Sequence, residues 1–247
     1  MEILQQTPHF LVVDDFLSPR DFEHVWSFFH QEPFRAVQAD RWIKAFRLSD
    51  GQPLWGDVYT SQPAHSSRTS VSTAFPSGTG IDALIQGILD HLPLFADYIG
   101  REGQDWSYFF CRPYLYPAGT GLSWHSDGRE DVAGAYVYYA HPKWRAHWGA
   151  ELLIDGSGFY DFEYPEHELY DGSKERLGLH LDARPMSDAV MKRAAGHYIL
   201  PSPNRFVLLR RGVLHRLNPV HPNAGDQLRA SITGFFVRSE AESEDDH

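Results

Sequence analysis

The sequence predicts a mainly β domain with flanking helices, an α+β order in which the strands form a barrel or a double-sheet jelly roll. Two helical patterns come early in the chain, and short segments rich in β-branched and aromatic residues follow them. Turns containing Gly and Pro separate these segments, as in barrels and jelly rolls. With 247 residues, 42% of them hydrophobic, the chain can build one sizeable core, so we expect a single domain over residues 1–247.

The N-terminal part is expected to combine one strand with two helices. Residues 9–16 (HFLVVDDF) have the composition of a short buried strand. Ser18 is the expected N-cap of a helix whose first residue is a proline. A second apolar pattern at helical spacing begins at Ile81, and Pro93 should end or kink that helix. Between the helices we expect loops and an edge strand around 42–48.

The rest of the chain reads as strands, one insertion and a tail. The expected strands cover residues 107–116, 132–140, 149–156, 204–212 and 228–237. Residues 157–203 do not continue the pattern of short strands and turns. They contain aromatic and acidic residues and a helical pattern at 186–195, so we expect an insertion or lid between core strands. Residues 239–247 (SEAESEDDH, after Arg238) form an acidic tail that we expect to be disordered.

Charge, hydropathy and cysteine content exclude several functional classes. A net charge of −11 argues against a nucleic-acid partner, whose binding surface would be basic. No apolar run approaches the ~20 residues of a membrane helix, so no membrane association is expected. The first residues, MEILQQTPHF, do not resemble a signal peptide, which favours a cytoplasmic protein. Cys111 is the only cysteine, which excludes an intramolecular disulfide and a multi-cysteine zinc site.

The segment YPAGTGLSWHSDG, residues 116–128, contains two candidate metal ligands. His125 and Asp127 are two residues apart, so in an extended segment both face the same side. An Fe(II) site for oxygen chemistry needs one more histidine. His215 is the candidate, because it follows a strongly apolar strand and a glycine turn. Other histidines compete for that position but fall in expected surface turns and loops: His141, His147 and His221.

A buried arginine is expected further along the chain. Arg229 begins the apolar segment RASITGFF, and a buried arginine needs an anionic partner. Its planar guanidinium suits a carboxylate, to which it can donate two parallel hydrogen bonds. Ser231 shares its face by the period of two and can add a hydroxyl donor. A dicarboxylate that binds a metal at one end and Arg229 at the other would use both features.

Together these residues resemble the HxD…H…RxS signature of the Fe(II)/2-oxoglutarate-dependent dioxygenases, in particular the prolyl-hydroxylase-like branch. Five further segments resemble that branch: DDFLSPRDF near the N-terminus, YPAGTG before the HxD, YYAHPKW at 138–144, GAEL at 149–152 and PNRFVLL at 203–209. The resemblance implies a double-stranded β-helix with N-terminal helices packed on its major sheet. It also implies Fe(II), 2-oxoglutarate as co-substrate and O₂, with ascorbate supporting activity.

The resemblance also implies roles for individual residues. It makes His125, Asp127 and His215 the iron ligands and catalytic centre. It makes Arg229 the partner of the distal 2-oxoglutarate carboxylate, assisted by Ser231. Two tyrosines resemble those that contact 2-oxoglutarate in the family, and they are Tyr116 and Tyr139. Tyr139 is chosen over its neighbour because alternation places it on the inward face.

Four functions are considered for this sequence. The first is a hydroxylase that oxidises an unactivated C–H bond of a small amino-acid-like or natural-product substrate, and the insertion at 157–203 favours it by suggesting an enclosed pocket. The second is a protein or peptide hydroxylase of the prolyl type. The third is a non-catalytic jelly-roll protein that binds a metal or ligand. A hydrolytic zinc enzyme is a weaker option, since two histidines and a carboxylate also suit zinc. The oligomeric state is not indicated.

Overall fold

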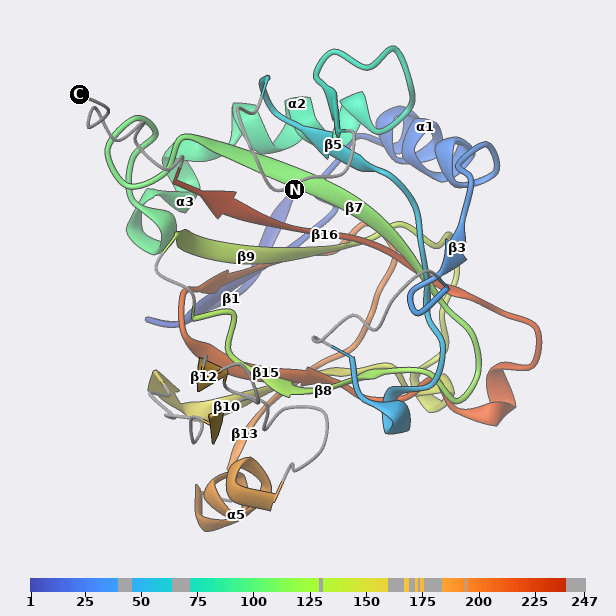
Figure 1. Ribbon diagram of the computed structural model, residues 1–247. Helices are drawn as coiled ribbons and strands as arrows, with labels where there is room; N and C mark the ends of the chain where they lie inside the picture. The colour runs from blue at the N-terminus through green and yellow to red at the C-terminus, as the bar shows by residue number, and fades with distance from the viewer. Residues whose placement is uncertain are drawn as a thin grey trace.

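The computed structural model describes residues 1–39, 46–63, 72–128, 131–159, 167–168, 172, 174–175, 184–193 and 195–238. Two β-sheets face each other, and helices cover the outer face of the larger one (Figure 1). This confirms the predicted mainly β fold with two facing sheets, the arrangement of a double-stranded β-helix.

The major sheet has ten strands, with the order β1-β2-β14-β9-β16-β7-β4-β3 and with β5 and β6 off that path. Its strands are β1 (Glu2–Gln6), β2 (Phe10–Asp14), β3 (Arg35–Ala36), β4 (Leu54–Trp55), β5 (Val58–Thr60), β6 (Ser72–Ala74), β7 (Tyr108–Tyr116), β9 (Val132–Tyr139), β14 (Phe206–Arg210) and β16 (Arg229–Val237).

The minor sheet has four strands in the order β13-β10-β15-β8. They are β8 (Leu122–His125), β10 (Leu152–Phe159), β13 (Gly196–Ile199) and β15 (Val213–Leu217). A separate two-stranded sheet pairs β11 (His167–Glu168) with β12 (Lys174–Glu175). Helix α5 (Arg184–Arg193) lies beyond the minor sheet, at the bottom of the view in Figure 1.

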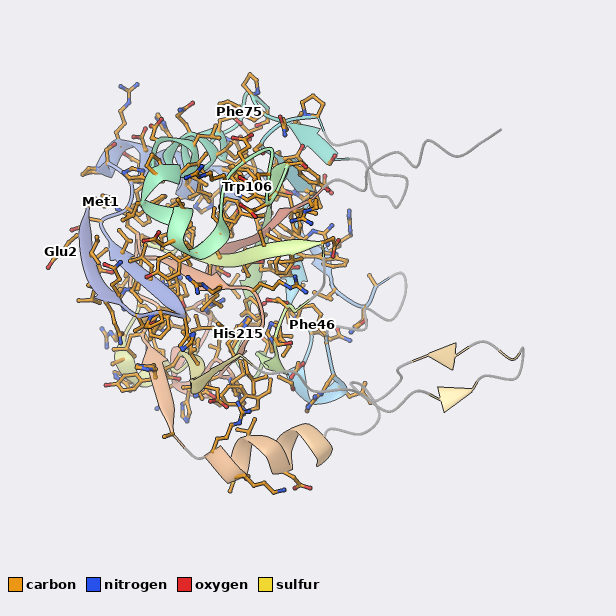
Figure 2. All side chains as sticks on the ribbon, turned by 90° about the vertical axis from the view of Figure 1, so that its left-hand side faces the viewer. Met1, Glu2, Phe46, Phe75, Trp106 and His215 are labelled. Carbon is orange, nitrogen blue, oxygen red and sulfur yellow. The ribbon has the colours of Figure 1, made fainter. Side chains whose placement is uncertain are left out.

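Three helices pack on the outer face of the major sheet: α1 (Pro19–Phe29), α2 (Asp82–Asp90) and α3 (Leu92–Ile99). Their buried side chains form one apolar cluster with the outward residues of the sheet, among them Ile232 and Phe236. In Figure 2, Trp106 of this cluster and His215 of the minor sheet lie on opposite sides of the major sheet. The N-terminal helices therefore form the outer layer that the resemblance implies.

Local signals explain the helix boundaries. The Asp21 N–H donates to the Ser18 hydroxyl at 3.2 Å, so Ser18 is the N-cap of α1 as predicted. The pattern that begins at Ile81 forms two helices, because Pro93 occupies the first turn of α3, where a missing N–H costs nothing. No helix in the described ranges is both long and apolar enough to span a membrane.

The predicted strands are present in the described residues, with the exception of the edge strand expected around 42–48. Strand β13 lies inside the segment 157–203, where it pairs with β10 and completes the minor sheet. The edge strand expected around 42–48 falls mostly outside the described residues, and β3 and β4 form that edge. Much of 157–203 and all of 239–247 also lie outside them, so the lid and the disordered tail stay predictions.

Candidate active site

Two neighbouring strands of the minor sheet bring the three predicted metal ligands together. His125 ends β8, and His215 lies directly opposite it on β15. Asp127 follows two residues after His125 with a φ of 46°, a left-handed conformation that Asp tolerates better than most residues. Its Oδ2 lies 3.3 Å from Nε2 of His215 and 3.7 Å from Nε2 of His125. One potential ligand atom from each residue lies within 4.8 Å of the others.

Backbone contacts orient both imidazoles in the same way. Nδ1 of His125 lies 2.8 Å from the carbonyl oxygen of Ser123, and Nδ1 of His215 lies 2.8 Å from that of Val213. We assign the ring proton to Nδ1 in each case, which leaves the Nε2 lone pairs directed at Asp127. Burial lowers the pKa of His125, and the nearby His215 ring lowers it further. The neutral form, which is the metal ligand, is therefore favoured.

The donor set fits ferrous iron. Two imidazole nitrogens and one carboxylate oxygen form the 2-His-1-carboxylate triad of non-haem Fe(II) oxygenases. The spacing between the facing ligand atoms is short enough for one ion to bind all three. The same atoms would also accept zinc, so the donor set alone does not select the metal.

A buried cation lies on the facing major sheet. Arg229 begins β16 and is 2% exposed. Its Nη1 donates to the Ser231 hydroxyl at 2.9 Å, and its guanidinium lies 5.0 Å from the ring centroid of Tyr116 and 4.9 Å from that of Tyr139. The Nε of Arg229 and the hydroxyl of Tyr139 are both buried without a hydrogen-bond partner.

These unpaired donors indicate an anion site. In the described part of the chain, no carboxylate lies within ion-pair distance of Arg229. A buried charge without a counter-ion is costly, and a bound carboxylate would remove that cost. Tyr139 faces this site, whereas the Tyr138 hydroxyl donates to Asn204 on the helix side of the sheet. Thus the predicted residues Tyr116, Tyr139 and Ser231 all contact Arg229 or lie beside it.

The other candidate histidines are not brought to the metal ligands. His147 is exposed, and His221 accepts a hydrogen bond from Asn223 N–H at the start of a short 3-10 turn. His141 was expected in a surface turn, and this was wrong, because it is only 2% exposed. Its Nδ1 lies 3.0 Å from the Ala230 carbonyl oxygen and its Nε2 lies 2.7 Å from that of Pro201. It therefore ties the end of β9 to β16 and to the segment before β14.

The burial of His141 predicts a pH dependence of stability. Desolvation lowers the pKa of His141 from 6.5 to about 4, so the folded chain stays unprotonated there while the unfolded chain takes up a proton. Its contribution to stability is therefore complete above the unfolded pKa and is lost as pH falls towards the folded pKa. We expect the difference in unfolding free energy between about pH 7.5 and about pH 5 to shrink in His141→Gln, measured by urea unfolding. An equal difference in both proteins would contradict this.

Sequence reasoning missed a second arginine inside the barrel. Arg112 lies on β7, four residues before Tyr116 and on the same face by alternation. The signal was present in the sequence, since a period of two through residues 107–116 puts Arg112, Tyr114 and Tyr116 on one side and Cys111 on the other. Trp55 on β4, whose ring lies under the Arg112 guanidinium, was also missed.

Comparisons with known proteins agree on the fold. The structure matches a prolyl-4-hydroxylase from Pseudomonas putida with a TM-score of 0.52 and 17% identity, over 93% of this chain and 94% of that one. It matches an oxidoreductase of the 2OG-Fe(II) oxygenase family from Burkholderia pseudomallei with a TM-score of 0.54 and 9% identity, over 98% of each chain. No protein-family model and no curated protein matched the sequence.

Both matches cover nearly the whole chain, so the similarity extends to the helices as well as to the two sheets. At these identities it establishes architecture. The ligand set comes from the chain itself, in which His125, Asp127 and His215 converge in the barrel. The protein therefore has the fold of the 2OG-Fe(II) oxygenases and carries within it an HxD…H facial triad.

Proposed function

We propose that this protein is an Fe(II)/2-oxoglutarate-dependent oxygenase that hydroxylates a C–H bond of a small amino-acid-like or natural-product substrate. The observation that carries this proposal is the convergence of His125, Asp127 and His215 within 4.8 Å on a fold shared with such oxygenases. The unpaired guanidinium of Arg229 supports it, because a protein that only binds a metal does not need a buried anion site.

The chain's contribution is to bind and orient. Ferrous iron, when bound, supplies oxygen activation coupled to the conversion of 2-oxoglutarate to succinate and CO₂. His125, Asp127 and His215 would hold it from one side and leave the other side for co-substrates. Arg229 would hold the distal carboxylate of 2-oxoglutarate, with Ser231 fixing its guanidinium. No acid or base is required of the protein, because the substrate loses a hydrogen atom.

Two features support a small substrate. The first is the segment 157–203, for which the sequence predicts an insertion or lid and much of which lies outside the described residues. The second is a further anion site described below. The prolyl type of hydroxylase is the alternative, since a protein named a prolyl-4-hydroxylase has this fold. The two candidates differ in whether a free small molecule or only a peptide stimulates turnover.

The test is succinate formation from 2-oxoglutarate with Fe(II), ascorbate and O₂, screened against free amino acids and against proline-containing peptides. We expect succinate only when Fe(II), 2-oxoglutarate and O₂ are all present, and we expect free small molecules to increase its rate. Stimulation by peptides alone would replace the small substrate by the prolyl-type alternative. Activity that follows Zn(II) and needs no O₂, or the absence of succinate under all conditions, would overturn the proposed reaction.

A further inference from the structure

Arg112 points into the barrel from the middle of β7. Residues 109 and 111 of this strand belong to the apolar cluster under the helices, so the alternate residues face the other sheet. Arg112 pairs with Thr233 of β16. Tyr114, two residues later on β7, pairs with Ser231. Arg112 therefore belongs to the same row of inward-facing residues on β7 as Tyr116, which pairs with Arg229. It lies four residues before Tyr116 on that strand.

Two buried N–H groups at Arg112 and Trp55 lack acceptors. Its guanidinium lies 4.3 Å from the ring centroid of Trp55, which is on the adjacent strand β4. Arg112 Nε and Trp55 Nε1 are both buried and have no hydrogen-bond partner. Within the described ranges, no carboxylate forms an ion pair with Arg112. Two adjacent N–H donors and a positive charge are thus left without an anion, as they are at Arg229.

Tyr114 lies between Arg112 and Tyr116 on the inward face of β7. Burial raises the pKa of Tyr114, the charge of Arg112 and a hydrogen bond from its guanidinium lower it, and the carboxylate of Asp127 raises it. The ring of Tyr114 lies 6.4 Å from that of Trp55 and 6.0 Å, stacked, from that of Tyr116. Aromatic rings therefore form a continuous wall from the Arg112 end of the barrel to the Arg229 end.

The two arginines need two different anions. Arg112 and Tyr116, which is the partner of Arg229 across the strands, are four residues apart on β7, which corresponds to ~13 Å along a strand. That is longer than the five-carbon chain of 2-oxoglutarate. A co-substrate held by Arg229 and the metal therefore leaves the donors of Arg112 and Trp55 unsatisfied.

We propose that Arg112 and Trp55 form a carboxylate-binding subsite for the primary substrate, which is therefore a small carboxylic acid. This inference rests on the proposed function of the same barrel. Each carboxylate oxygen accepts one N–H, from Arg112 and from Trp55, and the guanidinium supplies the charge. The body of the substrate lies against Tyr114, which places its C–H bonds towards the metal ligands. Arg112 as a whole is half-buried, although its Nε is buried.

Another arginine in this chain provides a matched control. Arg145 also lies over a tryptophan ring, with its guanidinium 5.4 Å from the centroid of Trp148. Arg145 is exposed, and neither its own N–H groups nor that of Trp148 are among the buried unsatisfied donors. Arg145→Met removes a charge and a cation–π contact, as Arg112→Met does, without touching the barrel interior. Any effect seen only in Arg112→Met therefore belongs to the subsite.

The experiment measures binding of free carboxylic acids and of their carboxamides by calorimetry. The ligands are the proteinogenic L-amino acids, their 2-hydroxy analogues and phenyl-substituted alkanoates. The protein is used loaded with Mn(II) and 2-oxoglutarate, and again without metal. We expect at least one acid to bind about tenfold or more tightly than its amide, because a charge-assisted hydrogen bond is lost in the amide. Arg112→Met should remove that preference, Trp55→Phe should weaken it, and Arg145→Met should leave it intact.

Three results would overturn the subsite. The first is that no acid in the panel is preferred over its amide by the wild-type protein. The second is an unchanged preference in a folded Arg112→Met variant. The third is that Arg112→Met weakens 2-oxoglutarate binding instead, which would assign this arginine to the co-substrate. If the wild-type protein binds neither Mn(II) nor 2-oxoglutarate but keeps an Arg112-dependent preference for acids, the proposed oxygenase function fails and the carboxylate subsite stands.

Discussion

Asp127→Ala is expected to lose stoichiometric Fe(II) binding, with a dissociation constant at least about a hundredfold higher than that of the wild-type protein. The reason is that Asp127 supplies the only carboxylate of the triad and lies between the two Nε2 atoms, at 3.3 and 3.7 Å. Without it, two imidazoles whose ring centroids are 4.2 Å apart are left without an anionic ligand beside them. Anaerobic titration with Fe(II), followed by calorimetry and by metal analysis of the desalted protein, measures the effect. His125→Ala should behave in the same way.

The control for this variant is Asp226→Ala, which removes an exposed carboxylate that lies outside the cluster of metal ligands. It should bind one equivalent of Fe(II), as the wild-type protein does. Thermal unfolding of both variants without metal shows whether each is folded. An Asp127→Ala protein that is folded and retains one equivalent of iron would remove Asp127 from the metal site.

Arg229→Met is expected to raise the 2-oxoglutarate dissociation constant about a hundredfold while Fe(II) stays bound. Arg229 is 2% exposed, no carboxylate in the described structure forms an ion pair with it, and its Nε has no acceptor. A carboxylate there gains a charge-assisted hydrogen bond in a site from which water is excluded. Calorimetric titration of 2-oxoglutarate into Mn(II)-loaded protein gives the constant directly.

Thermal unfolding distinguishes a specific loss of 2-oxoglutarate binding in Arg229→Met from misfolding of the variant. Removing a buried charge that has no counter-ion relieves a desolvation cost, so Arg229→Met without ligands should unfold at the same temperature as the wild-type protein or at a higher one. Ser231→Ala should weaken 2-oxoglutarate binding less, because it removes only the hydroxyl that positions Nη1. An unchanged 2-oxoglutarate affinity in folded Arg229→Met would mean that another group holds the distal carboxylate.

Strong periodic patterns allowed most of the fold to be predicted from the sequence. Strand β16 alternates between residues under the helices, such as Ile232, and inward residues such as Ser231, and the sequence shows this alternation directly. Strand β1 was missed because four of its five residues are exposed and carry no buried pattern. The split between α2 and α3 needed tertiary information, because a proline can either bend a helix or begin the next one.

The site was predictable to the extent that ligand type and spacing determine it. His125 and Asp127 are close in sequence, and His215 had to come from a strand that pairs with β8. The burial of His141 depends on carbonyl groups of two other segments, which no local pattern shows. Arg112 was predictable as an inward residue from the alternation along β7, but its contact with Trp55 was not, because Trp55 lies on a different strand.

The most direct measurement is a crystal structure of the protein with Mn(II) and 2-oxoglutarate, with the metal located by anomalous scattering. The account predicts one ion bound by Nε2 of His125, Nε2 of His215 and a carboxylate oxygen of Asp127. It also predicts that the distal carboxylate of 2-oxoglutarate contacts Arg229. An ion that leaves any one of the three side chains unbound, or a 2-oxoglutarate molecule whose distal carboxylate lies away from Arg229, would contradict it.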